Sequence, residues 1–342
     1  MKKVIIIGGG AAGYFTAINA KENNPELDIT ILEKGKDVLQ KVKISGGGRC
    51  NVTHACFEPK ELVKFYPRGE KELLGPFHQF MTGDTFEWFD NRGVPLKIED
   101  DNRVFPEANT SQAIIDCFQN AVDKLNIKVI TNCGVNSVTQ QDNKWIINTK
   151  EKTFEADKLV IAAGSSKKVW ELCETLDHSI IEPVPSLFTF NINDKRLVDL
   201  LGTSVPNATV KIANTKLEAS GPLLITHWGM SGPAILKLSA FGARILADKK
   251  YQYNVEVNWL SRPTDKVLNV LLNLKKKEPR KTAILKSPFS EVSKRLWERF
   301  VVAAGILPTQ NWADLNNFQL ENLANQLTKG IFNANGRTTF KE

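Results

Sequence analysis

The chain lacks the features that mark exported and membrane proteins. None of its 342 residues belongs to an apolar run that approaches the length needed to span a bilayer. The apolar run Val4–Ile7, which follows two lysines, is too short for the core of a signal peptide and leads directly into glycines. It therefore predicts a buried strand, and we expect a cytoplasmic protein with no membrane partner.

Cysteine is scarce, and its spacing excludes two kinds of site. The five cysteines are an odd number and include no C-x-x-C pair, which argues against a disulfide framework and against a zinc site. We expect reduced thiols and no metal. Cys50 stands apart because it lies in a glycine-rich motif, and a redox pair with Cys56 is the weaker alternative for it.

Internal repeats and low-complexity tracts are also missing, and the length predicts two or three domains. The composition, 42% hydrophobic and 24% charged, is typical of a soluble globular protein. A net charge of +7 leaves nucleic acid open as an acidic partner. A surface excess of lysine, densest at Lys275–Lys281, explains the charge as well, so we do not expect a nucleic-acid partner.

The first 33 residues hold the pattern of a dinucleotide-binding βαβ unit. The strand Val4–Ile7 leads into Gly8-Gly9-Gly10-Ala11-Ala12-Gly13, which fits G-x-G-x-x-G. A helix is predicted over residues 11–22, and a second strand over residues 29–32 ends at Glu33. Because every part occurs in order within one short unit, a dinucleotide site is favoured over some other glycine-rich turn.

Each position in this unit has a physical reason. Gly8 permits the tight turn, Gly10 lets a pyrophosphate approach the backbone, and Gly13 lets the helix pack closely. The helix N-terminus offers free N–H groups and a positive dipole end to the phosphates. Glu33 can accept hydrogen bonds from a ribose hydroxyl and would repel a 2′-phosphate. This unit alone does not distinguish FAD from NAD.

A second glycine cluster lies in the segment KVKISGGGRCNVT, residues 41–53. Three consecutive glycines, Gly46–Gly48, indicate backbone freedom or close approach to a ligand. Ser45, Arg49 and Asn51 bring a hydroxyl, a cation and an amide to the same loop. That set suits a pyrophosphate or the polar edge of a flavin, with a flexible surface loop as the alternative.

The two glycine-rich segments together resemble the BaiN/YhiN-like flavoproteins, a family of NAD(P)/FAD-dependent, aminoacetone-oxidase-like oxidoreductases. Three further segments resemble the same family: RVFP at Arg103–Pro106, with Asn102 where glycine is usual; ADKLVIAAG at residues 156–164, with Ala163 in place of threonine; and THWGMSGP at residues 226–233. The resemblance covers the whole chain. It implies a Rossmann-like, GR2-type FAD-binding α/β domain, FAD as cofactor, hydride transfer at the flavin N5 and a small-molecule substrate.

The resemblance, together with the motifs, gives a set of expected cofactor contacts. Gly164 and Ser165 follow a predicted strand whose carboxyl end faces the ligand, and the backbone of Val135 is expected at the adenine. The full set is Gly8, Gly10, Ala11, Ala12, Gly13, Glu33, Lys34, Lys41, Ser45, Gly46, Gly47, Gly48, Arg49, Cys50, Asn51, Val135, Ala163, Gly164 and Ser165. No residue is identified as a catalytic acid or base. His227 is a candidate, but a histidine satisfied by local hydrogen bonds fits equally well.

We expect an FAD-binding domain over residues 1–185, a β-rich, barrel-like insertion over 186–262, a helical subdomain over 263–332 and the start of a return to the FAD domain over 333–342. Ser111 is predicted to cap a helix, and further helices are predicted to begin at Thr264 and at Ser290. Residues 159–162 are predicted to form a buried strand. Family members continue beyond a segment like 338–342, so the part that covers the flavin is expected to be missing.

Three functional alternatives remain open at this point. The first is an FAD-dependent oxidoreductase, with NAD(P)H as an open candidate for a transient reductant because no second G-x-G-x-x-G occurs. The second is an FAD-dependent enzyme that modifies nucleic acid. The third is a non-catalytic flavoprotein remnant. The substrate and the oligomeric state are not predicted.

Overall fold

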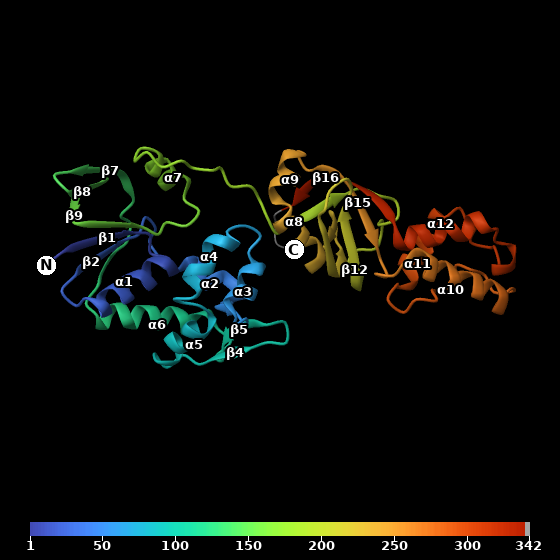
Figure 1. Cartoon of the computed structure of the whole chain (residues 1–342), viewed down its shortest axis with the longest axis horizontal. Coiled ribbons are helices and arrows are strands. Elements are labelled where there is room, and N and C mark those ends of the chain that lie inside the picture. The colour runs from blue at the N-terminus through green and yellow to red at the C-terminus, as the bar shows by residue number, and fades with distance from the viewer. Residues whose placement is uncertain (339–342) are drawn as a thin grey trace. The chain divides into compact units, whose positions relative to one another are not determined.

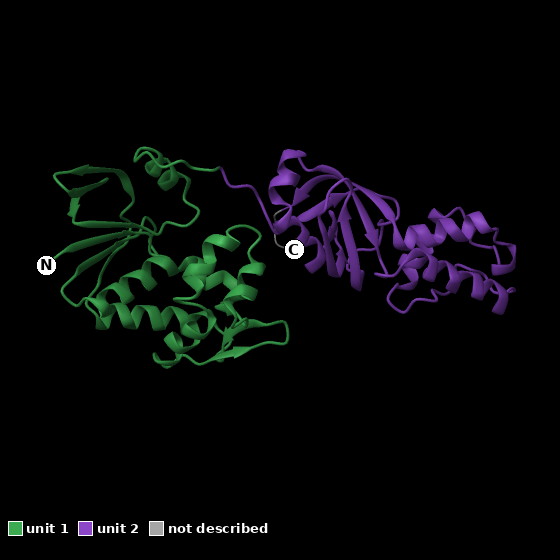
Figure 2. Ribbon diagram, viewed as in Figure 1, with its two compact units in different colours: residues 1–181 green, residues 182–342 purple. Residues whose placement is uncertain are grey.

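The computed structural model describes residues 1–338, and the chain divides into two compact units (Figure 2). Unit 1 comprises residues 1–181 and unit 2 comprises residues 182–342. Each unit holds hydrophobic clusters of its own. The fold class predicted from the sequence, an α/β Rossmann-like domain joined to a β-barrel and helices, is confirmed.

A four-stranded parallel sheet forms the centre of unit 1 (Figure 1). Its order is β10-β1-β2-β6, with β10 (Lys158–Ile161), β1 (Lys3–Ile7), β2 (Asp28–Leu32) and β6 (Lys128–Ile130). Val4 is in register with Ile29 on one side and Lys158 on the other. The prediction of a buried strand over 159–162 is wrong, because β10 lies at the edge of the sheet and Ile161 is 39% exposed.

Different layers cover the two faces of this sheet, since successive side chains of a strand point to opposite faces. Ile6 packs in a cluster with residues of α1 (Ala11–Asn23) and α6 (Ser111–Lys124). Ile5 packs on the other side, in a cluster with a second sheet and α7 (Lys167–Glu174). That second sheet is antiparallel and consists of β7 (Val135–Gln141), β8 (Lys144–Thr149) and β9 (Thr153–Ala156).

The rest of unit 1 is a set of short elements around the loop at residues 45–51. A small sheet has the order β3-β5-β4, with β3 (Thr53–His54), β4 (Leu96–Ile98) and β5 (Arg103–Pro106). The helices are α2 (Gln40–Ile44), α3 (Pro59–Leu62), α4 (Glu70–Phe77) and α5 (Thr82–Asp90). The N-cap of α6 is Thr110, which accepts from the N–H of Gln112, rather than the predicted Ser111. Ser111 instead donates its hydroxyl to the carbonyl of Lys43.

Unit 2 contains a closed antiparallel barrel with the strand order β11-β14-β13-β12-β15-β16. The strands are β11 (Thr189–Ile192), β12 (Ser204–Ile212), β13 (Glu218–Ile225), β14 (Gly229–Ser231), β15 (Gln252–Asn258) and β16 (Gly330–Thr338). Residues 333–338, expected to start a return to the FAD domain, instead belong to β16, which pairs with β11 and β15. The remainder of that expected segment, residues 339–342, lies outside the described residues.

The helices of unit 2 share one core with the barrel. They are α8 (Pro233–Phe241), α9 (Ala243–Asp248), α10 (Thr264–Lys277), α11 (Lys294–Ala303) and α12 (Asn317–Thr328). Trp259 contacts Phe300 of α11 and Phe332 of β16, so the predicted insertion and helical subdomain pack as one body. The prediction that a helix begins at Thr264 matches α10. Helix α11 begins at Lys294, after the N-cap Ser293, and not at Ser290.

The two units differ strongly in charge. Residues 1–181 contain 23 Lys and Arg against 25 Asp and Glu, a net charge of −2. Residues 182–342 contain 22 against 13, a net charge of +9. Unit 2 therefore carries all of the chain's positive excess. Among the described residues, no helix is long and apolar enough to cross a membrane, and no group of three metal-ligating side chains occurs.

Candidate functional site

Two glycines of the first motif are required by backbone packing. Gly8 ends β1 with φ +117°, and a Cβ there would lie 2.5 Å from the carbonyl oxygen of Ala162, which follows β10. A Cβ on Gly13 would lie 2.0 Å from the carbonyl oxygen of Gly8. Helix α1 is thus packed directly onto the turn, and a side chain at either position would displace backbone.

Gly10 is the opposite case, because a Cβ there would meet no atom within 4 Å. It is the N-cap of α1, makes no side-chain cap and is followed by a first turn with no acidic residue. Ala11 and Ala12 are exposed at the same helix end. The N-terminal N–H groups therefore face open space at the positive end of a helix, which is suited to an anionic phosphate group.

Glu33 lies at the carboxyl end of β2, beside this turn. Its carboxylate accepts from the N–H of Gly9 at 2.8 Å and from the N–H of Gly35 at 2.7 Å. These bonds hold the carboxylate in one orientation at the sheet edge. Each carboxylate oxygen can accept a further hydrogen bond, so the group retains acceptors for hydroxyls. The contact with Gly9 was not foreseen from the sequence.

The second glycine cluster forms a tight 3-10 turn over Ser45–Gly48. Gly46 has φ +56°, and a Cβ there would lie 2.7 Å from the amide nitrogen of Asn51 and 2.9 Å from the Phe105 ring. Gly47 and Gly48 are exposed, and a Cβ on either would meet nothing within 4 Å. One glycine thus fixes the turn, and the other two leave its backbone bare toward solvent.

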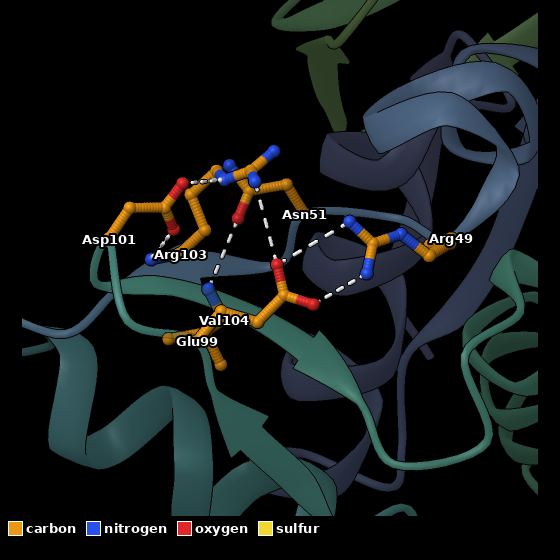
Figure 3. Close-up of polar contacts among 6 residues, drawn as sticks. All are labelled: Arg49, Asn51, Glu99, Asp101, Arg103 and Val104. Atoms are coloured by element: carbon orange, nitrogen blue, oxygen red, sulfur yellow. Dashed lines mark hydrogen bonds and ion pairs between the residues drawn. The ribbon is translucent and has the colours of Figure 1, made fainter. Parts of the chain in front are cut away.

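Arg49 is held within unit 1 by the carboxylate of Glu99 (Figure 3) and by the ring of Phe105. Its guanidinium donates to both oxygens of Glu99, at 2.5 Å and 3.4 Å, and lies 3.9 Å from the centroid of Phe105. The hydrogen bond from Arg49 lowers the pKa of the Glu99 carboxyl. Arg103 also approaches Glu99, at 3.5 Å. The expected cation of this loop is therefore already paired, and Glu99, its partner, was missed by sequence reasoning.

The two residues after Arg49 have structural contacts as well. Asn51 Oδ1 accepts from the N–H of Val104 at 3.3 Å, which joins the loop to β5 (Figure 3). Cys50 is buried with φ +62°. Burial raises the pKa of its thiol, against a smaller lowering by a hydrogen bond with Ser45. A buried thiol with a raised pKa is a poor nucleophile.

A polar contact connects α2 with the segment after β10. Lys41 Nζ donates to Ser165 Oγ at 2.6 Å, and Gly164, with φ +57°, has its Cβ position 3.5 Å from the same nitrogen. The Trp170 indole N–H donates to the carbonyl of Gly164 at 3.2 Å, a contact that the sequence gave no reason to expect. The N–H of Leu39 donates to the carbonyl of Gly9 and joins the segment after β2 to the glycine turn.

The remaining expected residues lie around the same edge or form its wall. Lys34 is exposed and follows Glu33, and its Cβ lies 3.6 Å from the Cβ position of Gly134. Val135 is buried at the start of β7, and Ala163 backs onto Gly8. The structure thus brings together the segments after β1, β2 and β10 with α2, all at the carboxyl edge of the parallel sheet, where ligands of such sheets bind.

The THWGMSGP segment lies in unit 2, where it forms the turn from β13 into β14 and the start of α8. His227 is exposed and contacts Trp228 edge-on, with ring centroids 5.3 Å apart. Gly229 has φ +144°, and a Cβ there would lie 2.4 Å from the carbonyl oxygen of Phe190. The glycine therefore serves the pairing of β14 with β11. Within the described residues of unit 2, His227 has no partner for proton transfer.

A family model described as the HI0933-like protein Rossmann domain matches residues 2–336. The chain belongs to the HI0933-like family. This is the BaiN/YhiN-like family of FAD-dependent oxidoreductases that the sequence motifs resemble, so the family prediction is confirmed.

Two relatives of this HI0933-like chain are named for different activities. A 3-dehydro-bile acid delta(4,6)-reductase of Clostridium scindens is 23% identical over 76% of this chain and 65% of its own length. A ribosomal RNA dihydrouridine synthase of Haemophilus influenzae is 23% identical over 98% of this chain and 83% of its own length. Among solved structures, THI4 of Thermovibrio ammonificans is 12% identical, covers 54% of this chain and 66% of its own, and has a TM-score of 0.36. The chain spans about two thirds of the bile acid reductase.

Proposed function

We propose that this HI0933-like chain binds FAD at the carboxyl edge of its parallel sheet and acts as an oxidoreductase. The observation that supports the proposal most directly is the open space at Gly10, at an uncapped helix N-terminus, between two glycines that backbone packing requires. A diphosphate fits such a position, because N–H groups and the helix dipole both favour an anion there. Family membership favours FAD over NAD as the dinucleotide.

Each part of the edge then has a proposed role toward the dinucleotide. The N–H groups at Gly10, Ala11 and Ala12 bind the pyrophosphate, and the oriented carboxylate of Glu33 accepts from the adenosine ribose. Gly47 and Gly48 offer bare backbone to the flavin side. Arg49 supports this loop through Glu99 rather than contacting phosphate. Lys41 and Ser165 close the edge across the sheet.

When bound, FAD supplies hydride transfer at its N5 position, with NAD(P)H as the proposed source of electrons. The names of both relatives describe the reduction of carbon–carbon double bonds, in a steroid and in a uracil ring. We therefore place the substrate of this chain in the class of unsaturated ring compounds whose double bond accepts a hydride. A small molecule is the first candidate. An RNA base is the second, favoured by the net charge of +9 on unit 2.

The proposal is tested by adding FAD to the purified chain, removing free FAD by gel filtration and recording the absorbance spectrum. We expect flavin absorbance to remain with the protein and to bleach when NADPH or NADH is added without oxygen. Protein that elutes without flavin would exclude FAD binding by this chain. Flavin that remains but is reduced by neither nicotinamide would exclude NAD(P)H as reductant while leaving FAD binding intact.

A matched pair of variants locates the bound FAD. Gly10→Val adds a side chain in open space at a φ of −94°, so the fold is expected to tolerate it. The same side chain occupies the proposed pyrophosphate position, and we expect FAD affinity to fall at least about tenfold, the effect of roughly 1.4 kcal/mol. Gly83→Val, also in open space but on α5, is the control and should bind FAD normally. Equal affinity of the two variants would contradict the proposed position.

A further inference from the structure

Helix α11 presents one face to a groove in unit 2. Its residues Leu296, Trp297, Phe300 and Val301 are buried in the core. Arg295, Arg299 and Val302 lie on the other side, at spacings of four and three residues that place them on one face of a helix. They line a groove of about 740 Å³ together with Lys195, Gln326 and one acidic residue, Glu298. We call this surface the α11 groove.

Two cations of the α11 groove are unpaired in the described part of the chain, since the groove's acidic residue, Glu298, lies 3.9 Å from Lys294 instead. Lys195 and Arg295 are exposed and have no acidic partner among residues 1–338. Arg299 approaches Asp199 at 3.4 Å, an exposed pair that is worth little in water. Arg196 is different, because it is bound to Asp194 and Gln326 and stacks on Phe332, so it forms the wall of the groove rather than a free charge.

The helical segment that contains α11 is basic as well. Residues 262–329, which contain α10, α11 and α12, hold twelve Lys and Arg against six Asp and Glu, a net charge of +6. A net positive charge on this segment attracts polyanions over a range set by the salt concentration.

We propose that the α11 groove is a binding surface for RNA, so that unit 2 holds an RNA substrate. This deepens the proposed function and rests on it, because it selects the RNA base among the two substrate classes. Cations bind phosphates, and the exposed Val302, at 55%, offers an apolar surface to ribose and base. A groove favours a strand over a membrane, since the cations of Arg295 and Lys195 line a hollow that a flat lipid surface would not enter.

The test uses the full chain loaded with FAD and a fluorescein-labelled RNA stem-loop, with binding followed by fluorescence anisotropy at increasing KCl. We expect binding that weakens linearly in log Kd against log salt. The double variant Lys195→Glu with Arg295→Glu should bind at least about tenfold more weakly, with a salt slope shallower by about one to two. Lys237→Glu, an exposed residue of α8 outside the groove, is the matched control and should bind as the unchanged chain does.

The outcomes separate this inference from the proposed function. Retained flavin with no RNA binding, or RNA binding that the double variant does not weaken, would overturn the inference and leave the FAD proposal standing. Binding of phosphatidylserine vesicles in preference to RNA would overturn it in favour of a lipid surface. If the double variant unfolds, which its melting curve would reveal, Arg295→Gln alone should still weaken RNA binding, and an unchanged affinity of that variant would also overturn the inference.

Discussion

The carboxyl edge of the parallel sheet and the α11 groove both suit anionic groups, but they do so by opposite means. At the edge, the donors are backbone N–H groups, and Gly8, Gly10 and Gly13 matter because they have no side chains. In the groove, the donors are the long side chains of Lys195, Arg295 and Arg299. Anion binding at the edge should therefore weaken when a side chain is added to one of these glycines. Anion binding in the groove should weaken when one of these cations is removed. Each variant below changes residues of a single unit.

The largest effect is expected from the core of unit 2. Trp297 is fully buried, and its indole N–H donates to the carbonyl of Ala283 at 3.0 Å. Trp297→Ala should lower the free energy of unfolding by about 3–5 kcal/mol, measured by urea titration. Trp228→Ala, at a position 46% exposed, should cost less than about 1 kcal/mol. FAD should stay bound in both variants, and loss of flavin from Trp297→Ala would show that the two units do not act separately.

A smaller destabilisation is expected from the tight contact in unit 1. Gly13→Ala places a methyl group 2.0 Å from the Gly8 carbonyl oxygen, so α1 must shift away from the sheet. We expect a loss of about 2–3 kcal/mol and slower FAD binding, measured by urea unfolding and by flavin fluorescence. Gly83→Ala, inside α5 and in open space, should instead gain about 0.5–1 kcal/mol. Equal shifts in the two variants would mean that the close packing of α1 is not needed.

The Arg49–Glu99 pair gives a pH-dependent effect in unit 1. Because its hydrogen bond with Arg49 lowers the pKa of Glu99 in the folded chain, the pair stabilises the fold fully above the ordinary pKa of 4.5. That contribution is lost as the pH falls through the lower, folded-state pKa. The thermal midpoint of the unchanged chain should therefore fall more than that of Glu99→Gln on acidification from about pH 6 to about pH 3.

Glu61→Gln serves as the comparison for this experiment. Glu61 of α3 forms an exposed pair with Lys64, three residues later in the chain, and such pairs contribute little. The acid sensitivity of the Glu61→Gln variant should match that of the unchanged chain. If Glu99→Gln and the unchanged chain lose stability in parallel, the pair does not hold the loop at residues 45–51.

The smallest effect concerns thiol reactivity. Cys50 is buried with a raised pKa, whereas Cys56 is only partly buried. Iodoacetamide at about pH 8 should label Cys56 before Cys50, as read by mass spectrometry of the peptides. Cys56→Ser should leave the slow labelling of Cys50 unchanged. Faster labelling of Cys50 would point to a reactive thiol and favour the redox pair that the sequence left as an alternative.

Local patterns in the sequence predicted the βαβ unit well. The run Val4–Ile7, the glycines after it and the strand ending at Glu33 are signals a few residues apart, and the structure has the same elements in the same order. The Asp142–Asn143 turn between β7 and β8 is equally local, and both of its residues have positive φ. Family-level motifs then supplied what local patterns do not, the choice of FAD.

Contacts between distant residues could not be predicted in this way. Arg49 is 50 positions from Glu99, and Lys41 is 124 positions from Ser165, so neither pair leaves a local signal. The exposure of β10 depends on which strand lies at the sheet edge, which its apolar sequence does not record. The membership of residues 333–338 in the barrel depends on pairing with β11, which is more than 130 positions earlier.

The pairing of β15 with β16 has a consequence for how unit 2 is built. Val257 and Gly330 are partners in that antiparallel pair, although the 72 residues of α10, α11, α12 and their connections lie between them. The whole basic segment therefore connects two neighbouring strands of the barrel, β15 and β16, where a hairpin loop would be enough. We call this inserted segment the cassette. A change in the length of this cassette would therefore leave the strand order of the barrel intact.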